Sequence, residues 1–72
     1  MSITTAQIEQ MEIDAGTAGD LLQAAICQIA LSGEVSEATM AVLGDSERAT
    51  AATYTRNTAA AECASAFADT GE

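Results

Sequence analysis

Alanine is the residue that most constrains this chain, because it supplies 17 of the residues that make the sequence 49% hydrophobic. Alanine is the strongest helix former, and the chain contains no proline to interrupt a helix. Burying its methyl group gains far less than the roughly 1.5–3 kcal/mol of a buried leucine or isoleucine. The sequence therefore predicts an all-α fold with a thin core, either as a marginally stable monomer or stabilised by self-association.

The length of 72 residues allows one helical domain, residues 1–72. We expect a small bundle of three to four helices in which the second helix is central and apolar. A first helix is expected from about Thr5 to Ala15, with Thr4 or Thr5 as its cap. A second is expected from about Thr17 to Ser32, and its apolar residues occupy nearly the whole circumference, which is typical of a buried helix.

The second half of the chain is predicted to form a short helix and a long one. The short helix starts near Ser36 and ends before Gly44, and the long one is capped by Asp45 or Ser46 and reaches about Asp69. The two become one element if the glycine lies inside a helix. Small residues and one aromatic form the expected inward stripe of the long helix: Ala49, Thr53, Ala60, Ala64 and Phe67.

The expected location is the cytoplasm. The N-terminus lacks the basic segment and the apolar stretch of a secretory signal. The longest apolar stretch, Leu21 to Leu31, is too short to span a bilayer, so no membrane association is expected. In this compartment Cys27 and Cys63 are expected to be reduced and to act as small buried hydrophobes.

The charge balance argues against most chemistry. Eleven acidic residues, two arginines, no lysine and no histidine give a net charge of -9. Without histidine or lysine the chain lacks the usual general base, metal ligand and Schiff-base residue, so we expect no enzyme activity, no cofactor and no metal site. The helix after Gly33 begins with Glu34 and Glu37 instead of basic residues, which excludes direct nucleic-acid binding.

The acidic residues fall into two groups along the predicted helices. One group lies at or near helix starts, where negative charge complements the helix dipole: Asp20, Glu34, Glu37, Asp45 and Glu47. The other lies at helix ends or extends the same faces, and is the predicted partner-binding set: Glu9, Glu12, Asp14, Glu62, Asp69 and Glu72. Acids at a helix end oppose the dipole, so stability does not explain them. This set merges into one acidic surface if the first and last helices pack side by side.

Three interpretations of that surface are open: a binding face for a basic partner, charge that keeps the protein dispersed, or adaptation to a high-salt cytoplasm. We favour the first. The expected function is a non-enzymatic inhibitor or adaptor that occludes the basic nucleic-acid-binding surface of a protein partner. By analogy of class, DNA mimics and anti-CRISPR proteins of phages and mobile elements act in this way. The alternatives are a homo-oligomeric structural protein, such as a homodimer, and a small accessory subunit of an enzyme that docks through Tyr54 or Phe67.

Overall fold

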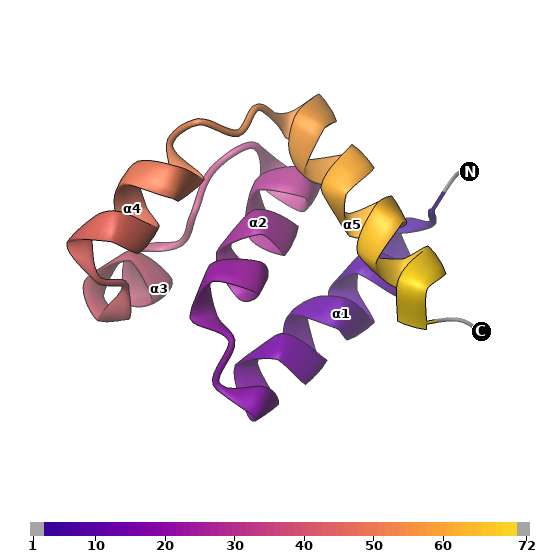
Figure 1. Cartoon of the computed structure of the whole chain (residues 1–72), viewed down its shortest axis with the longest axis horizontal. Helices are drawn as coiled ribbons and strands as arrows, with labels where there is room; N and C mark the ends of the chain where they lie inside the picture. Colours follow the sequence, from indigo (N-terminus) through magenta and orange to yellow (C-terminus); the bar gives the residue numbers. More distant parts are fainter. Residues whose placement is uncertain (1–2, 71–72) are drawn as a thin grey trace.

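The computed structural model describes residues 3–70, which form helices and connecting turns without a strand. Five helices follow one another along the chain (Figure 1): α1 (Thr5–Ala18), α2 (Leu21–Ser32), α3 (Glu37–Val42), α4 (Asp45–Ala51) and α5 (Arg56–Thr70). The all-α prediction is confirmed. The expected number of helices, three to four, is too low because the predicted long final helix is divided into two.

The first helix is longer than predicted. Its start is confirmed, because the Thr4 hydroxyl accepts a hydrogen bond from the Gln7 N–H at 3.1 Å and the Thr4 N–H donates to the Gln7 side chain at 2.8 Å. The helix passes through Gly16 and ends at Gly19, which has a left-handed φ of 80° that favours glycine. The predicted boundary between the first two helices, at residues 15–17, is therefore wrong.

The second and third helices begin at side-chain caps. Asp20 accepts a hydrogen bond from the Gln23 N–H at 3.2 Å, so α2 starts several residues later than predicted. Ser36 accepts one from the Thr39 N–H at 3.3 Å, which confirms the predicted start of the third helix. Gly33 ends α2 with a φ of 88°.

The predicted long final helix is wrong in its start and in its continuity. Its first part, α4, begins after Gly44, so the break between the third and fourth helices is confirmed, but the glycine and not Asp45 or Ser46 occupies the cap position. A new helix then starts after Thr55. The Thr55 N–H donates to the Thr58 hydroxyl at 2.8 Å, and the Thr58 N–H donates to the Thr55 hydroxyl at 3.2 Å. This reciprocal pair satisfies backbone donors at the start of α5 in the manner of a capping box.

The core forms around α2, which packs against all four other helices. As Figure 1 shows, α1 and α2 run side by side in opposite directions, α5 lies across them, and α3 and α4 lie on the other side of α2. Six residues of α2 are buried: Ala24, Ala25, Ile26, Cys27, Ile29 and Ala30. The core is built largely from small side chains, in agreement with the composition.

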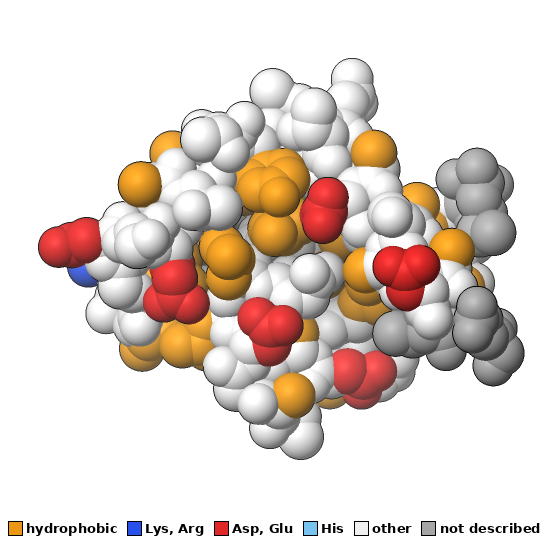
Figure 2. Space-filling model, in the orientation of Figure 1, with side chains coloured by type: hydrophobic (Ala, Val, Ile, Leu, Met, Phe, Trp, Pro, Cys, Tyr) orange, Lys and Arg blue, Asp and Glu red, His pale blue; other side chains and the backbone are white. Residues whose placement is uncertain are grey.

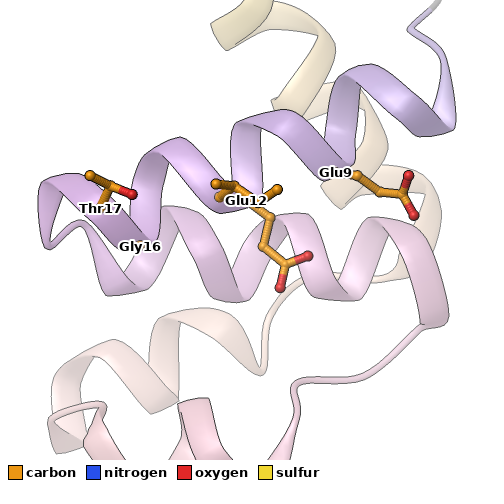
Figure 3. A pocket seen from close by; sticks show the side chains of 5 residues that line it. Glu9, Glu12, Gly16 and Thr17 are labelled. Atoms are coloured by element: carbon orange, nitrogen blue, oxygen red, sulfur yellow. The ribbon is translucent and has the colours of Figure 1, made fainter.

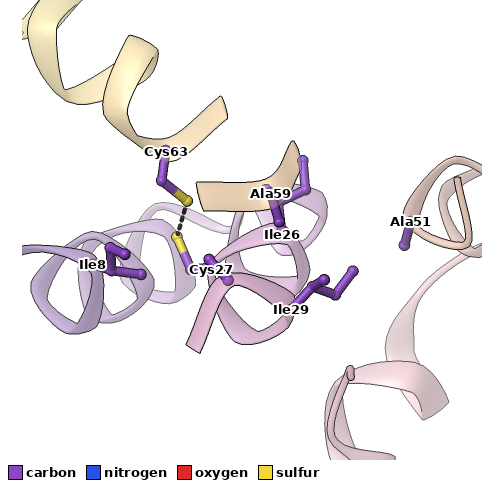
Figure 4. Packing of buried hydrophobic residues seen from close by; sticks show 8 residues of the cluster. Ile8, Ile26, Cys27, Ile29, Ala51, Ala59 and Cys63 are labelled. Carbon is purple, nitrogen blue, oxygen red and sulfur yellow. Dashed lines mark hydrogen bonds between the residues drawn. The ribbon is translucent and has the colours of Figure 1, made fainter. Parts of the chain in front are cut away.

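The inward face of α5 differs from the predicted stripe. Ala59 and Cys63, one turn apart, are fully buried against α2 (Figure 4), whereas Ala49 and Thr53 are exposed. The predicted stripe assumes one continuous helix. The break at residues 52–55 changes which face of the last helix points inward. The other three predicted members are half-buried: Ala60, Ala64 and Phe67.

Candidate functional site

Four of the five acids that the sequence assigns to helix starts lie there, and the fifth, Glu34, lies in the connection between α2 and α3. Asp20 is the cap of α2, Glu37 lies in the first turn of α3, and Asp45 and Glu47 lie in the first turn of α4. The Glu47 carboxylate also accepts a hydrogen bond from the Gly44 N–H at 3.0 Å. These residues stabilise helix N-termini, and their presence needs no partner to explain it.

Both arginines are engaged at helix ends. Arg56 donates from Nη2 to the Leu31 carbonyl in the last turn of α2, at 3.1 Å. Arg48 donates from Nε to the Leu43 carbonyl after α3, at 3.2 Å, and its Nη2 lies 3.4 Å from Asp45 Oδ1. Cations are favoured at these carbonyls. Within the described residues, neither arginine pairs with a member of the predicted partner-binding set.

Glu9 and Glu12 project from the same side of α1 (Figure 3). With Ile13, Gly16 and Thr17 they line an open groove along that side of the helix. Glu9 is exposed, whereas Glu12 is half-buried and its Oε2 accepts a hydrogen bond from the Gln28 side chain of α2 at 3.0 Å. Glu12 therefore contributes to the packing of α1 on α2.

Asp14 lies on a different side of α1. A helix turns 100° per residue, so Asp14 is rotated by about 140° from Glu9 and about 160° from Glu12. Its carboxylate accepts a hydrogen bond from the Gln10 side chain at 3.0 Å, and it lines a groove with Met11 and Phe67, where α1 meets α5.

A further groove adjoins the one beside Phe67 and shares Met11 and Asp14 with it, between α1 and the C-terminal half of α5. Asp14 and Asp20 both line it, together with Gln23 of α2 and Ala66 of α5. Ala66 lies four residues after Glu62 and three before Asp69, so these two exposed acids share its side of α5. The name α1–α5 acidic groove is used below for this groove, which Asp14 and Asp20 line, together with Glu62 and Asp69 on the adjoining side of α5.

The structure therefore divides the predicted partner-binding set. It places Asp14 in one groove with Ala66, whose side of α5 Glu62 and Asp69 share, and leaves Glu9 and Glu12 on the other side of α1. Glu72 lies outside the described residues. In Figure 2 the acidic side chains are likewise spread across the visible face, with apolar side chains between them.

Sequence analysis missed Asp20 as a member of the groove. It assigned this residue to a helix start, which is correct, but a cap residue in the tight turn between α1 and α2 is also held next to the end of α1. The short connection between the two helices was the available signal, because it places their adjoining ends together.

The aromatic residues proposed as docking anchors are both half-buried. Tyr54 packs against the buried core cluster, so this side chain fills space in the core. Phe67 lines the groove beside Met11 and Asp14. The large apolar residues that are exposed lie elsewhere, on α1 and α3: Ile13, Met40 and Val42.

Cys27 and Cys63 are free and fully buried, with their sulfur atoms 3.6 Å apart. Burial raises the pKa of the Cys63 thiol from 9.0 to about 12, and burial also raises the pKa of the Cys27 thiol. Such thiols stay protonated at neutral pH, which opposes a role as an activated nucleophile.

Comparisons of the chain with protein-family models, with curated proteins and with solved structures find no match. Over residues 3–70, none of the helices has the length and apolar character required to cross a membrane. In the same part of the chain, no three cysteine or acidic side chains are grouped so that they could hold a metal ion.

Proposed function

We propose that this protein is a non-enzymatic binding module that occludes a basic, nucleic-acid-binding surface of a protein partner, and that it does so through the α1–α5 acidic groove. The observation that supports this function is the open groove lined by the carboxylates of Asp14 and Asp20, beside the side of α5 on which Glu62 and Asp69 are exposed. Spaced carboxylates on a rigid helical surface can occupy positions that phosphates take against a row of arginines or lysines.

The placement of the cations supports the same function. Arg56, at the start of α5, is separated from Asp69 by roughly 20 Å along the helix, and it donates to a backbone carbonyl of α2. Arg48 is engaged in α4. A basic partner therefore meets carboxylates at the groove that are not already paired with an arginine, and within residues 3–70 no ion pair has to break on binding.

Affinity purification with two matched variants tests the proposal. The groove variant carries Asp14→Asn, Glu62→Gln and Asp69→Asn, and the control carries Glu9→Gln, Glu34→Gln and Glu37→Gln. Both lose three negative charges, so they differ in the position of the change and not in net charge. Asp20 is left intact because it caps α2.

The wild-type chain and the control variant should capture the same protein from cells of the source or its host at low salt, and the groove variant should not. Capture should weaken steeply with added salt, since exposed charges are screened. The purified partner should then lose its bound DNA or RNA when the wild-type chain is added. Equal capture by the groove variant, capture that is insensitive to salt, or a partner that keeps its nucleic acid would contradict the proposal.

The exposed apolar residues favour a second candidate, a helical homo-oligomer or accessory subunit. Val42 is 59% exposed and Ile13 is 62% exposed, although the chain has few large apolar residues to leave in water. Light scattering over a dilution series tests self-association. A folded monomer at low micromolar concentration, unchanged by Val42→Ser, would exclude the homo-oligomer.

A further inference from the structure

Two fully buried thiols face one another between α2 and α5. The sulfur atoms of Cys27 and Cys63 lie 3.6 Å apart, and Figure 4 shows their side chains pointing toward each other from the two helices. The residues are 36 positions apart in sequence, so only the packing of α5 on α2 brings them together.

The surroundings hold the two sulfur atoms as a pair. Ala59 precedes Cys63 by one turn on the same buried face of α5, and its small side chain permits α5 to lie close to α2. The Gln23 side chain approaches Cys27 Sγ at 3.7 Å. A disulfide has a sulfur–sulfur bond of about 2.05 Å, so bond formation requires an approach of roughly 1.5 Å, within the reach of side-chain rotation and a small shift of a terminal helix.

We propose that Cys27 and Cys63 are a modification site that closes into an intramolecular disulfide by exchange with a dissolved low-molecular-weight disulfide. One protein thiol loses its proton and attacks the dissolved disulfide, which forms a mixed disulfide and releases one small thiol. The other protein thiolate attacks the protein sulfur of that mixed disulfide and releases the second small thiol. The two cysteines are oxidised together, and the dissolved disulfide is reduced to two thiols.

This bond would fasten α5 to α2 across a long loop. In the loop-entropy treatment, a cross-link between residues 36 apart raises the folding equilibrium constant roughly several-hundred-fold. The reaction proceeds through transient opening of the structure, because both thiols are shielded from solvent and protonated at neutral pH. Formation of the disulfide is therefore slow, and the disulfide is protected from small reductants once α2 and α5 have closed over it.

Equilibration of the reduced wild-type chain in glutathione buffers of graded redox ratio tests the proposal, with one series in native buffer and one in concentrated urea. After acid quenching and alkylation, intact mass distinguishes the intramolecular disulfide, which has lost two hydrogen atoms, from chains that carry glutathione. We expect the disulfide to form in monomers without glutathione adducts. The effective concentration of one cysteine thiol relative to the other, obtained from this equilibrium, should be several-hundred-fold higher in native buffer than in urea.

The stability of the fold supplies an independent measurement. The factor by which folding raises the effective thiol concentration equals the factor by which the disulfide raises the folding equilibrium constant. Urea unfolding of the oxidised chain should therefore show a higher midpoint than that of the reduced chain. Cys27→Ala and Cys63→Ala serve as controls, since neither variant should show an oxidation-dependent midpoint. The decisive measurements use the wild-type chain, so the result does not depend on whether these variants fold.

Three outcomes would overturn the inference: glutathione on both cysteines of the folded chain, disulfide-linked dimers as the main product, or equal effective concentrations in native buffer and in urea. The acidic groove has no part in this experiment, so the inference stands or fails independently of the proposed function.

Discussion

Gln28 donates a hydrogen bond from its side-chain amide to the Glu12 carboxylate at 3.0 Å, and this contact joins α2 to α1. The same amide nitrogen donates to the Thr39 hydroxyl at 2.8 Å, and the amide oxygen accepts from the Ser36 N–H at 2.9 Å. One half-buried side chain on α2 therefore holds α1 and also the start of α3.

Replacement of this amide should destabilise the fold. Gln28→Leu keeps most of the side-chain volume but removes the three hydrogen bonds that the amide makes, and we expect the free energy of unfolding to fall by about 1–3 kcal/mol. Urea denaturation measures the change. Gln10→Leu removes an amide that bonds only to exposed Asp14 within the described residues, and should change stability by less than about 0.5 kcal/mol. Equal effects of the two substitutions would show that Gln28 does not brace the three helices.

The buried thiols should make stability fall at high pH. Burial raises the pKa of Cys63 from 9.0 to about 12, so between these values the unfolded chain has lost a proton that the folded chain keeps. The contribution is fully present below pH 9 and declines above it by about 1.4 kcal/mol per pH unit. Urea denaturation of the reduced chain from pH 8 to 10.5, at half-unit steps, measures the slope. Cys63→Ala should show a shallower decline, and parallel pH profiles would contradict the expectation.

The reciprocal threonine pair should be required for the start of α5. Thr55→Ala removes the hydroxyl that accepts from the Thr58 N–H, and should lower the free energy of unfolding by about 1 kcal/mol. Thr55→Asp retains an acceptor at this position and should preserve stability, since a negative charge is also favoured at a helix start. Thermal unfolding compares the variants. If Thr55→Asp is as unstable as Thr55→Ala, the hydroxyl is not acting as a cap.

Two glycines near the end of α1 should respond to alanine in opposite directions. Gly16 lies within the helix, and a methyl group there would meet no atom within 4 Å, so Gly16→Ala should stabilise by about 0.5–1 kcal/mol. Gly19 ends the helix with a φ of 80°, and Gly19→Ala should destabilise by about 1 kcal/mol. Thermal unfolding of both variants gives the comparison. A destabilising Gly16→Ala would mean that the helix does not continue through this residue.

The sequence predicts some helix boundaries of this fold and misses others. Thr4 and Ser36 were identified as starts because short polar residues followed by helix formers have a local signature. The break before α5 was missed because two threonines cap each other there, and this pairing lacks the acidic or amide partner of the usual capping box. The sequence does not distinguish Gly16, inside α1, from Gly19, which ends it, because the two glycines differ in backbone conformation and not in residue type.

The site depends on tertiary arrangement, which the sequence conveys only in part. The i, i+7 alignment of Glu62 and Asp69 follows from helix geometry alone, but the angle at which α5 crosses α1 decides which acids they join. That angle brings Ala66, which shares their side of α5, to the groove that Asp14 lines, and it leaves Glu12 with Gln28. Likewise, the burial of Cys27 was predicted from its type, whereas its pairing with Cys63 depends on the register between α2 and α5.

The position of α2 against every other helix has a consequence for how the molecule opens. Among the described residues, the contacts that do not involve α2 are small, and the largest of them joins α1 to α5, so little of the packing remains once α2 is lost. Amide protons in the middle of α2 should therefore exchange with deuterium only when the whole domain unfolds, whereas those of the short α3 and α4 exchange through local openings. The slowest-exchanging amides would then report the global stability of the domain, and they should belong to the helix whose sequence is the most apolar.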